Sequence, residues 1–229
     1  MTTDPRGSRT FHTAVLLTVS GGWLDAYTYS ARGGVFANAQ TGNIVKLGIA
    51  AAQGDLHQML SCLIPVIAFT FGILLSLIIE SNLEKRKIPF IRRAVLLVEI
   101  GVLLIVMFLP QDELFNRIAN ALISFICAMQ MEAFRTFEGQ AFATLVSTGN
   151  LRKAIEYLYS GIRSADSAKK KTGIRYLLIV ALFITGAVLG TLVTDAFPRI
   201  SLFGPVFLFV LSFIWITARW FRIKAGDFQ

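Results

Sequence analysis

The chain of 229 residues is 55% hydrophobic and 16% charged, and its mean hydropathy is +0.63. A soluble domain of this size must cover its exterior with polar atoms, so the composition excludes that class and indicates an integral membrane protein. The net charge of +8 does not indicate nucleic-acid binding, because the basic residues lie in short segments between apolar runs.

Six segments are apolar and long enough for a transmembrane helix, which needs about 20 residues to cross the hydrocarbon core. In chain order they are residues 11–30, 59–79, 91–109, 114–134, 176–197 and 201–220. The first is interpreted as an uncleaved helix, because it is too long for a signal peptide and has no clear small-residue cleavage site. In the fifth, Gly186 and Gly190 form a GxxxG pattern that favours close packing of helices.

Two further segments, residues 34–52 and 139–161, have intermediate polarity and contain the TGN part of a repeated signature. Each copy of the signature has an acidic residue, an alanine and an aromatic residue, and a Thr-Gly-Asn motif that begins 16 residues after the acid. The copies are Asp25-Ala26-Tyr27 with Thr41-Gly42-Asn43 and, 107 residues later, Glu132-Ala133-Phe134 with Thr148-Gly149-Asn150. Because the spacing is shared and the surroundings are apolar, the pattern indicates an internal duplication.

The distribution of Lys and Arg predicts how the chain crosses the membrane, because short cytoplasmic loops are enriched in them. If the six apolar segments span and the two polar segments do not, 18 of the 22 basic residues and both termini lie in the cytoplasm. The polar segments are then re-entrant or half-helix segments. An arrangement in which all eight segments span also places both termini inside, so the topology depends on whether the polar segments cross.

The six-span topology divides one membrane domain into two repeats, residues 1–110 and 111–229, each with three spans and one polar segment. Since three is an odd number, the second repeat runs in the opposite sense to the first, as in inverted-repeat transporters. The predicted fold is an all-α integral membrane protein with six transmembrane helices and two re-entrant segments in two inverted repeats. The TGN motifs would then approach each other near the middle of the membrane.

Three ionisable residues lie inside predicted spans, where charge is costly, and are therefore candidate functional residues. Asp25 and Glu132 lie late in their spans; gating or ion binding and a structural hydrogen bond to the polar segments are equally compatible with them. Glu99 lies in the middle of the third span and has no acidic counterpart in the other repeat. It is the preferred residue for coupling to a proton or cation, with a structural hydrogen bond as the alternative.

The polar side chains of the TGN segments are candidate groups for binding a solute or ion. Gly42 and Gly149 permit a bend or a close approach of the backbone. The hydroxyl and amide groups can contact a solute or cap half-helices, and the two roles are compatible. The complete candidate set is Asp25, Asn38, Thr41, Gly42, Asn43, Glu99, Glu132, Thr148, Gly149 and Asn150.

No cofactor or metal site is expected. Cys62 and Cys127 lie in apolar runs without metal-ligand spacing, and His12 and His57 are too few for a histidine site. The sequence contains no Walker, GxSxG, HExxH or Rossmann motif. An intramembrane enzyme is therefore the least favoured function.

Between Gly22 and Gly48 the sequence resembles the signature of the YoaK family of bacterial membrane proteins, a domain of unknown function. The residues that match are Asp25, Ala26, Tyr27, Phe36, Thr41, Gly42, Asn43 and Gly48, and the resemblance extends over nearly the whole chain. It implies a protein of the bacterial inner membrane. It implies neither a substrate nor catalytic residues.

The sequence favours a small transporter or permease that moves a small solute or ion through a site between the repeats. A channel-like pore and a non-catalytic scaffold or sensor subunit are the alternatives. The expected partners are membrane lipid and a small solute or ion, and a homodimer is compatible with so small a bundle. The substrate, the coupling ion and the direction of transport cannot be read from the residues.

Overall fold

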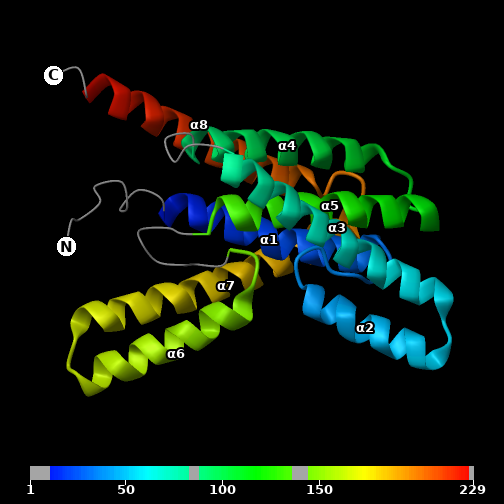
Figure 1. Ribbon diagram of the computed structural model, residues 1–229, viewed down its shortest axis with the longest axis horizontal. Helices are drawn as coiled ribbons and strands as arrows, with labels where there is room; N and C mark the ends of the chain where they lie inside the picture. The colour runs from blue at the N-terminus through cyan, green and yellow to red at the C-terminus, as the bar shows by residue number, and fades with distance from the viewer. Residues whose placement is uncertain (1–10, 83–87, 136–143, 227–229) are drawn as a thin grey trace.

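The computed structural model describes residues 11–82, 88–135 and 144–226, and every regular element in these ranges is an α-helix (Figure 1). The helices are α1 (Phe11–Ala31), α2 (Gln40–Gln53), α3 (Leu56–Asn82), α4 (Ile88–Phe108), α5 (Glu113–Ala133), α6 (Ser147–Arg163), α7 (Ser167–Ala196) and α8 (Phe203–Gly226). Among the described residues, α3, α5 and α7 are long and apolar enough to cross a membrane, and Phe203–Ala218 of α8 is a shorter apolar helix. The predicted all-α class is confirmed.

Each predicted span corresponds to one helix, but α7 extends well beyond its predicted span. It begins at Ser167, nine residues before the expected start at 176. Asp166 caps this end, because its side chain accepts hydrogen bonds from the backbone N–H groups of Ala168 and Lys169. The lysines at 169–171, which precede the fifth predicted span, therefore lie in the first turns of α7.

The helices of the two polar segments begin at equivalent positions. α2 starts at Gln40 and α6 starts at Ser147, in each case one residue before the TGN motif. Irregular backbone therefore precedes each motif, over residues 32–39 in the first segment and 144–146 in the described part of the second. α2 and α6 lie toward opposite ends of the long axis of the molecule (Figure 1).

The packing partners of the first four helices correspond to those of the last four. α1 packs on α7 and α8, while α5 packs on α3 and α4. α2 packs on α3, and α6 packs on α7; in addition, α4 packs on α8, and α1 touches α5. If the labels α1, α2, α3 and α4 are exchanged with α5, α6, α7 and α8 in that order, the same set of packing pairs is obtained.

Glycine allows two of these helix pairs to approach closely. A Cβ atom at Gly22 of α1 would lie 2.0 Å from the backbone oxygen of Phe183 in α7, and one at Gly186 of α7 would lie 2.1 Å from a backbone oxygen of α1. The GxxxG pattern that contains Gly186 therefore packs α7 against α1 within the chain. Between α3 and α5, a Cβ atom at Gly72 would lie 2.5 Å from the backbone oxygen of Phe125.

Candidate functional site

The chain turns back into the bundle after α1, and Asp25 holds it there. The carboxylate of Asp25, a residue only 5% exposed, accepts a hydrogen bond from the backbone N–H of Asn38 at 2.7 Å. The Asn38 side chain donates to the backbone oxygen of Gly21 at 2.9 Å, and the N–H of Ala37 donates to the Thr28 hydroxyl at 3.1 Å. α2 therefore begins beside the middle of α1, with a carboxylate near its N-terminus, where the helix dipole favours negative charge.

The segment before the second TGN motif reaches the same place on α1. A Cβ atom at Gly21 would lie 3.2 Å from the backbone oxygen of Thr144 and 2.6 Å from Cδ2 of Leu145. Leu145 and Asn38 occupy the same position relative to their TGN motifs, three residues before the threonine. The two segments that lead into α2 and α6 therefore meet at Gly21.

The asparagines of both TGN motifs are buried and bind the backbone that precedes them. Asn43 is fully enclosed; its Oδ1 accepts from the N–H of Phe36 at 2.9 Å, and its Nδ2 donates to the backbone oxygen of Phe36 at 2.7 Å. Asn150 is 2% exposed and donates to the backbone oxygen of Val146 at 3.1 Å. These contacts hold α2 and α6 each to the segment that precedes it.

The remaining TGN residues face outward. Thr41, Thr148 and Gly149 are exposed, so neither threonine side chain lines an interior space. Gly42 is half-buried, and a Cβ atom there would lie 3.0 Å from the Phe36 ring, whereas nothing lies within 4 Å of one at Gly149. Close backbone approach therefore explains the glycine of the first motif and not that of the second.

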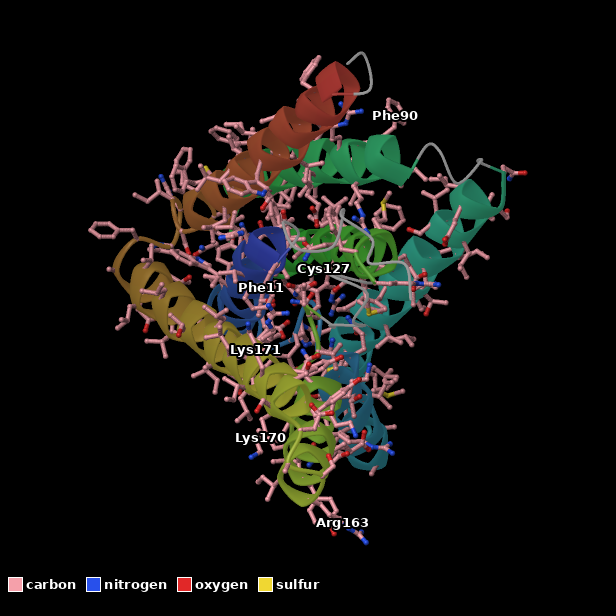
Figure 2. The ribbon with its side chains drawn as sticks, turned by 90° about the vertical axis from the view of Figure 1, so that its left-hand side faces the viewer. Phe11, Phe90, Cys127, Arg163, Lys170 and Lys171 are labelled. Atoms are coloured by element: carbon pink, nitrogen blue, oxygen red, sulfur yellow. The ribbon has the colours of Figure 1, made fainter. Side chains whose placement is uncertain are left out.

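Glu99 lies in the middle of α4 and is 0% exposed. Within the described residues, neither of its carboxyl oxygens has a hydrogen-bond partner. Glu99 and Asp25 both lie close enough to Cys127 to act electrostatically on its thiol, and Figure 2 shows Cys127 in the middle of the bundle. Ser124, one turn before Cys127 on α5, also has a buried hydroxyl without a partner in the described part of the chain. α1, α4 and α5 thus bring polar groups together in the core.

Glu132 has surroundings different from those of Asp25, its equivalent in the repeated signature. Its side chain forms an ion pair with Arg135 and lines a pocket of about 240 Å³ between α3, α4 and α5. Arg92 lines the same pocket and donates to the backbone oxygen of Ala133 at 3.0 Å. The pocket lies where α3 ends, α4 begins and α5 ends.

Arg32 is a buried charge in the short connection between the first predicted span and the first polar segment. It directly follows α1 and is 2% exposed. Its guanidinium group donates hydrogen bonds to the backbone oxygens of Val106, Leu109 and Pro110 and to the side chains of Tyr27 and Asn116. Gly33 and Gly34, the two residues after Arg32, are the feature of the sequence that indicates a sharp turn here. Their φ values are 90° and 73°, in the region that favours glycine.

The fold defines an all-helical protein with membrane-spanning helices, and sequence comparison gives its family. The DUF1275 family, described as a protein of unknown function, matches residues 13–215, so the chain belongs to this family. The UPF0700 transmembrane protein YoaK of Bacillus subtilis (strain 168) is 26% identical over 199 residues, which cover 84% of this chain and 88% of the relative. No solved structure matches the chain. The resemblance to the YoaK family is confirmed, and the protein is a membrane protein.

Proposed function

We propose that this protein is a small transporter of the plasma membrane, which moves a small solute or ion and uses Glu99 to bind a coupling proton or cation. The observation that carries the proposal is the Glu99 carboxyl group, which is fully enclosed and has no hydrogen-bond partner in the described residues. An ionised carboxylate without a partner is unfavourable inside a membrane, so this group is stable only when it holds a proton or a cation. Reversible binding of this kind is what coupled transport requires.

The arrangement of the helices supports two inverted repeats, residues 1–110 and 111–229. The packing pairs of α1–α4 match those of α5–α8, and the segments that lead into α2 and α6 meet at Gly21. In this proposal α1, α3, α4, α5, α7 and α8 span the membrane, both termini are cytoplasmic, and α2 and α6 enter from opposite sides. Inverted repeats place their binding sites between the halves near the midplane, beside discontinuous helices.

The polar residues near the centre fit a site between the halves. Asp25 and Glu99 belong to the first repeat, and Cys127 belongs to the second. Asn38 adds a buried side-chain oxygen without a partner in the described residues, which leaves it available to a solute. In this division of roles Asp25 and Asn43 position α2, while Glu99 and Asn38 contact what is transported.

Two other functions, a pore and a scaffold or sensor subunit, would give Glu99 a different role or none. A channel-like pore would pass its solute without coupling and would not require Glu99 to gain and lose a proton. A non-catalytic scaffold or sensor subunit would leave the unpartnered carboxyl in the core without a role. We do not propose enzymatic activity, because the sequence contains no Walker, GxSxG, HExxH or Rossmann motif.

Flux measurements in liposomes test the proposal. The purified protein is reconstituted into liposomes that contain a pH indicator. The liposomes are then exposed in turn to a panel of amino acids, organic acids, sugars, Na⁺ and K⁺. We expect at least one compound to drive proton or cation movement, and we expect Glu99→Gln to abolish it. Glu113→Gln is the matched control, since Glu113 lies on the surface in ion pairs with His57 and Arg117. Uptake that Glu99→Gln leaves unchanged would favour a pore, and no flux with any compound would contradict transport.

A further inference from the structure

A pocket opens at the end of the bundle where α3 ends, α4 begins and α5 ends. We call it the inner pocket; it has a volume of about 240 Å³, and its polar lining consists of Ser76, Glu80, Arg92, Glu132 and Arg135. The α3–α4 connection at this end carries Lys85, Arg86 and Lys87 in the sequence, so the end is expected to face the cytoplasm.

Glu99 lies one helical turn beyond the inner pocket. Among the residues that line the pocket, Val95 lies furthest from the start of α4, and Met129 lies furthest from the end of α5. Val95 and Glu99 are four residues apart, so they share a helix face and are separated by about 6 Å along the axis. Cys127, on whose thiol Glu99 acts, is two residues from Met129. Val95 and Met129 are 5% and 7% exposed, and they are the buried apolar lining residues at the side of the inner pocket toward Glu99.

The corresponding junction at the other end of the molecule is packed around the Trp23 ring. It is formed by α1, α7 and α8, the packing counterparts of α5, α3 and α4. The Trp23 indole N–H donates to the Ser201 hydroxyl at 3.1 Å, and that hydroxyl lies 2.7 Å from the Thr194 hydroxyl. A Cβ atom at Gly204 would lie 2.5 Å from the Trp23 ring, so the ring packs directly against the start of α8. Of the two equivalent junctions, the first contains the inner pocket, and the second contains the packed Trp23 ring.

We propose that the inner pocket is the opening through which Glu99 exchanges a proton with water on the cytoplasmic side. The inference rests on the proposed role of Glu99 and names the proton as its ion. Glu99 releases the proton to a water molecule that enters past Val95 and Met129; hydronium leaves through the pocket, and the reverse step restores the carboxyl. The titratable group that interacts with Glu99 is Cys127 of α5, and Asp25 of α1 acts on the same thiol, while residues 203–218 of α8 contain no titratable side chain. The charged groups at the mouth are Glu80, Arg92, Glu132 and Arg135.

Cysteine labelling tests whether water reaches the inner pocket and from which side. Ser76→Cys places a thiol in the pocket, and Ser201→Cys places the matched thiol in the junction that contains Trp23, each in a Cys62→Ala/Cys127→Ala background. With a membrane-impermeant maleimide, we expect Ser76→Cys to react in inside-out vesicles and not in intact cells. Ser201→Cys should react in neither. An unreactive Ser76→Cys, or one labelled from outside, would overturn the proposal.

Infrared spectroscopy in heavy water tests the connection to Glu99 itself. The carbonyl band of the protonated carboxyl is assigned by its absence from Glu99→Gln, and its shift on deuteration gives the exchange rate. We expect Val95→Phe to slow this exchange at least about tenfold, because local opening must then replace direct access. Met129→Phe, a substitution close in volume, should act in the same direction. Leu104→Phe on the exposed face of α4 is the control and should leave the rate unchanged.

These results separate the inference from the transport proposal. Exchange that Val95→Phe and Met129→Phe leave as fast as in the unmodified protein would show that Glu99 is reached by another route. Neither measurement depends on transport. If labelling and exchange are as expected but no compound moves in the liposomes, the transport proposal is contradicted and the proton-access inference stands.

Discussion

The buried guanidinium group of Arg32 donates a hydrogen bond to the backbone oxygen of Pro110, 78 residues further along the chain, at 2.6 Å. The same group binds the backbone oxygens of Val106 at 3.0 Å and Leu109 at 3.2 Å. The backbone oxygen of Arg32 accepts in turn from the Asn120 side chain at 2.7 Å. Because the last carbonyls of a helix have no partner within it, Arg32 completes the hydrogen bonding of α4 and joins the end of α1 to the α4–α5 turn.

Replacing this arginine should destabilise the protein even when the positive charge is kept. We expect Arg32→Lys to lower the free energy of unfolding by about 3 kcal/mol, because an ammonium group cannot reach several carbonyls as a planar guanidinium does. Thermal unfolding in detergent, followed by a dye that reacts with the buried thiols of Cys62 and Cys127, measures the change. Arg152→Lys is the control, since the Arg152 side chain is 81% exposed. Equal unfolding temperatures for the two variants would contradict the role of Arg32.

Asp25 is expected to position the segment before α2, and its variants should differ in stability. Asp25→Ala removes the acceptor for the Asn38 N–H and should destabilise the protein by about 2 kcal/mol, since a buried donor loses its charged partner. Asp25→Asn keeps a side-chain oxygen and should lose less than half as much. If both variants unfold like the unmodified protein but lose flux, Asp25 binds the transported species and the positioning role is wrong.

Substitutions at the two ends of the first TGN motif should change the free energy of unfolding by different amounts. Asn43→Ala removes two hydrogen bonds to the Phe36 backbone inside the protein and should lower the free energy of unfolding by about 2 kcal/mol. Thr41→Ala should change it by less than about 0.5 kcal/mol, because the side chain is exposed. Thermal unfolding of both variants and flux by Thr41→Ala check this. Loss of flux in a stable Thr41→Ala variant would show that the threonine contacts a solute.

The close packing of α1 on α7 predicts a large effect from a single methyl group. Gly22→Ala should destabilise the protein by about 2 kcal/mol, because the new Cβ atom would overlap the backbone oxygen of Phe183. Gly101→Ala in α4 is the matched control, since nothing lies within 4 Å of its Cβ position. That variant should be as stable as the unmodified protein or slightly more stable, because alanine favours helix. Similar losses in both variants would contradict this packing.

The helices were predictable from sequence where the apolar runs are long, and less so where polar residues extend them. The run from 59 to 79 locates α3 well, whereas the start of α7 depends on the Asp166 cap and lies among lysines that suggest a loop. Glu99 could be named as a candidate because an acid in an apolar run is unusual. The absence of hydrogen-bond partners for Glu99 among the described residues could not be predicted, because it depends on how α5 and α8 pack on α4.

Residues whose role depends on distant backbone were beyond prediction. Arg32 looks like a loop arginine, because its carbonyl partners lie 74 to 78 residues away. The outward position of Thr41 follows from which face of α2 is covered by α3, and the motif itself does not contain that information. For Asn43 the motif suggests a cap or a solute contact, whereas its side chain binds the backbone of Phe36, seven residues earlier.

Everything proposed for Glu99 depends on two halves that cross the membrane in opposite senses, and the ends of α2 and α6 test this most directly. Single cysteines at Gln53→Cys and Ser164→Cys, in the Cys62→Ala/Cys127→Ala background, place exposed thiols just at the end of α2 and just after α6. The account predicts that an impermeant maleimide labels Gln53→Cys in intact cells and Ser164→Cys only in inside-out vesicles. If both positions react only from the cytoplasmic side, α2 and α6 cross the membrane, and the inverted-repeat account is wrong.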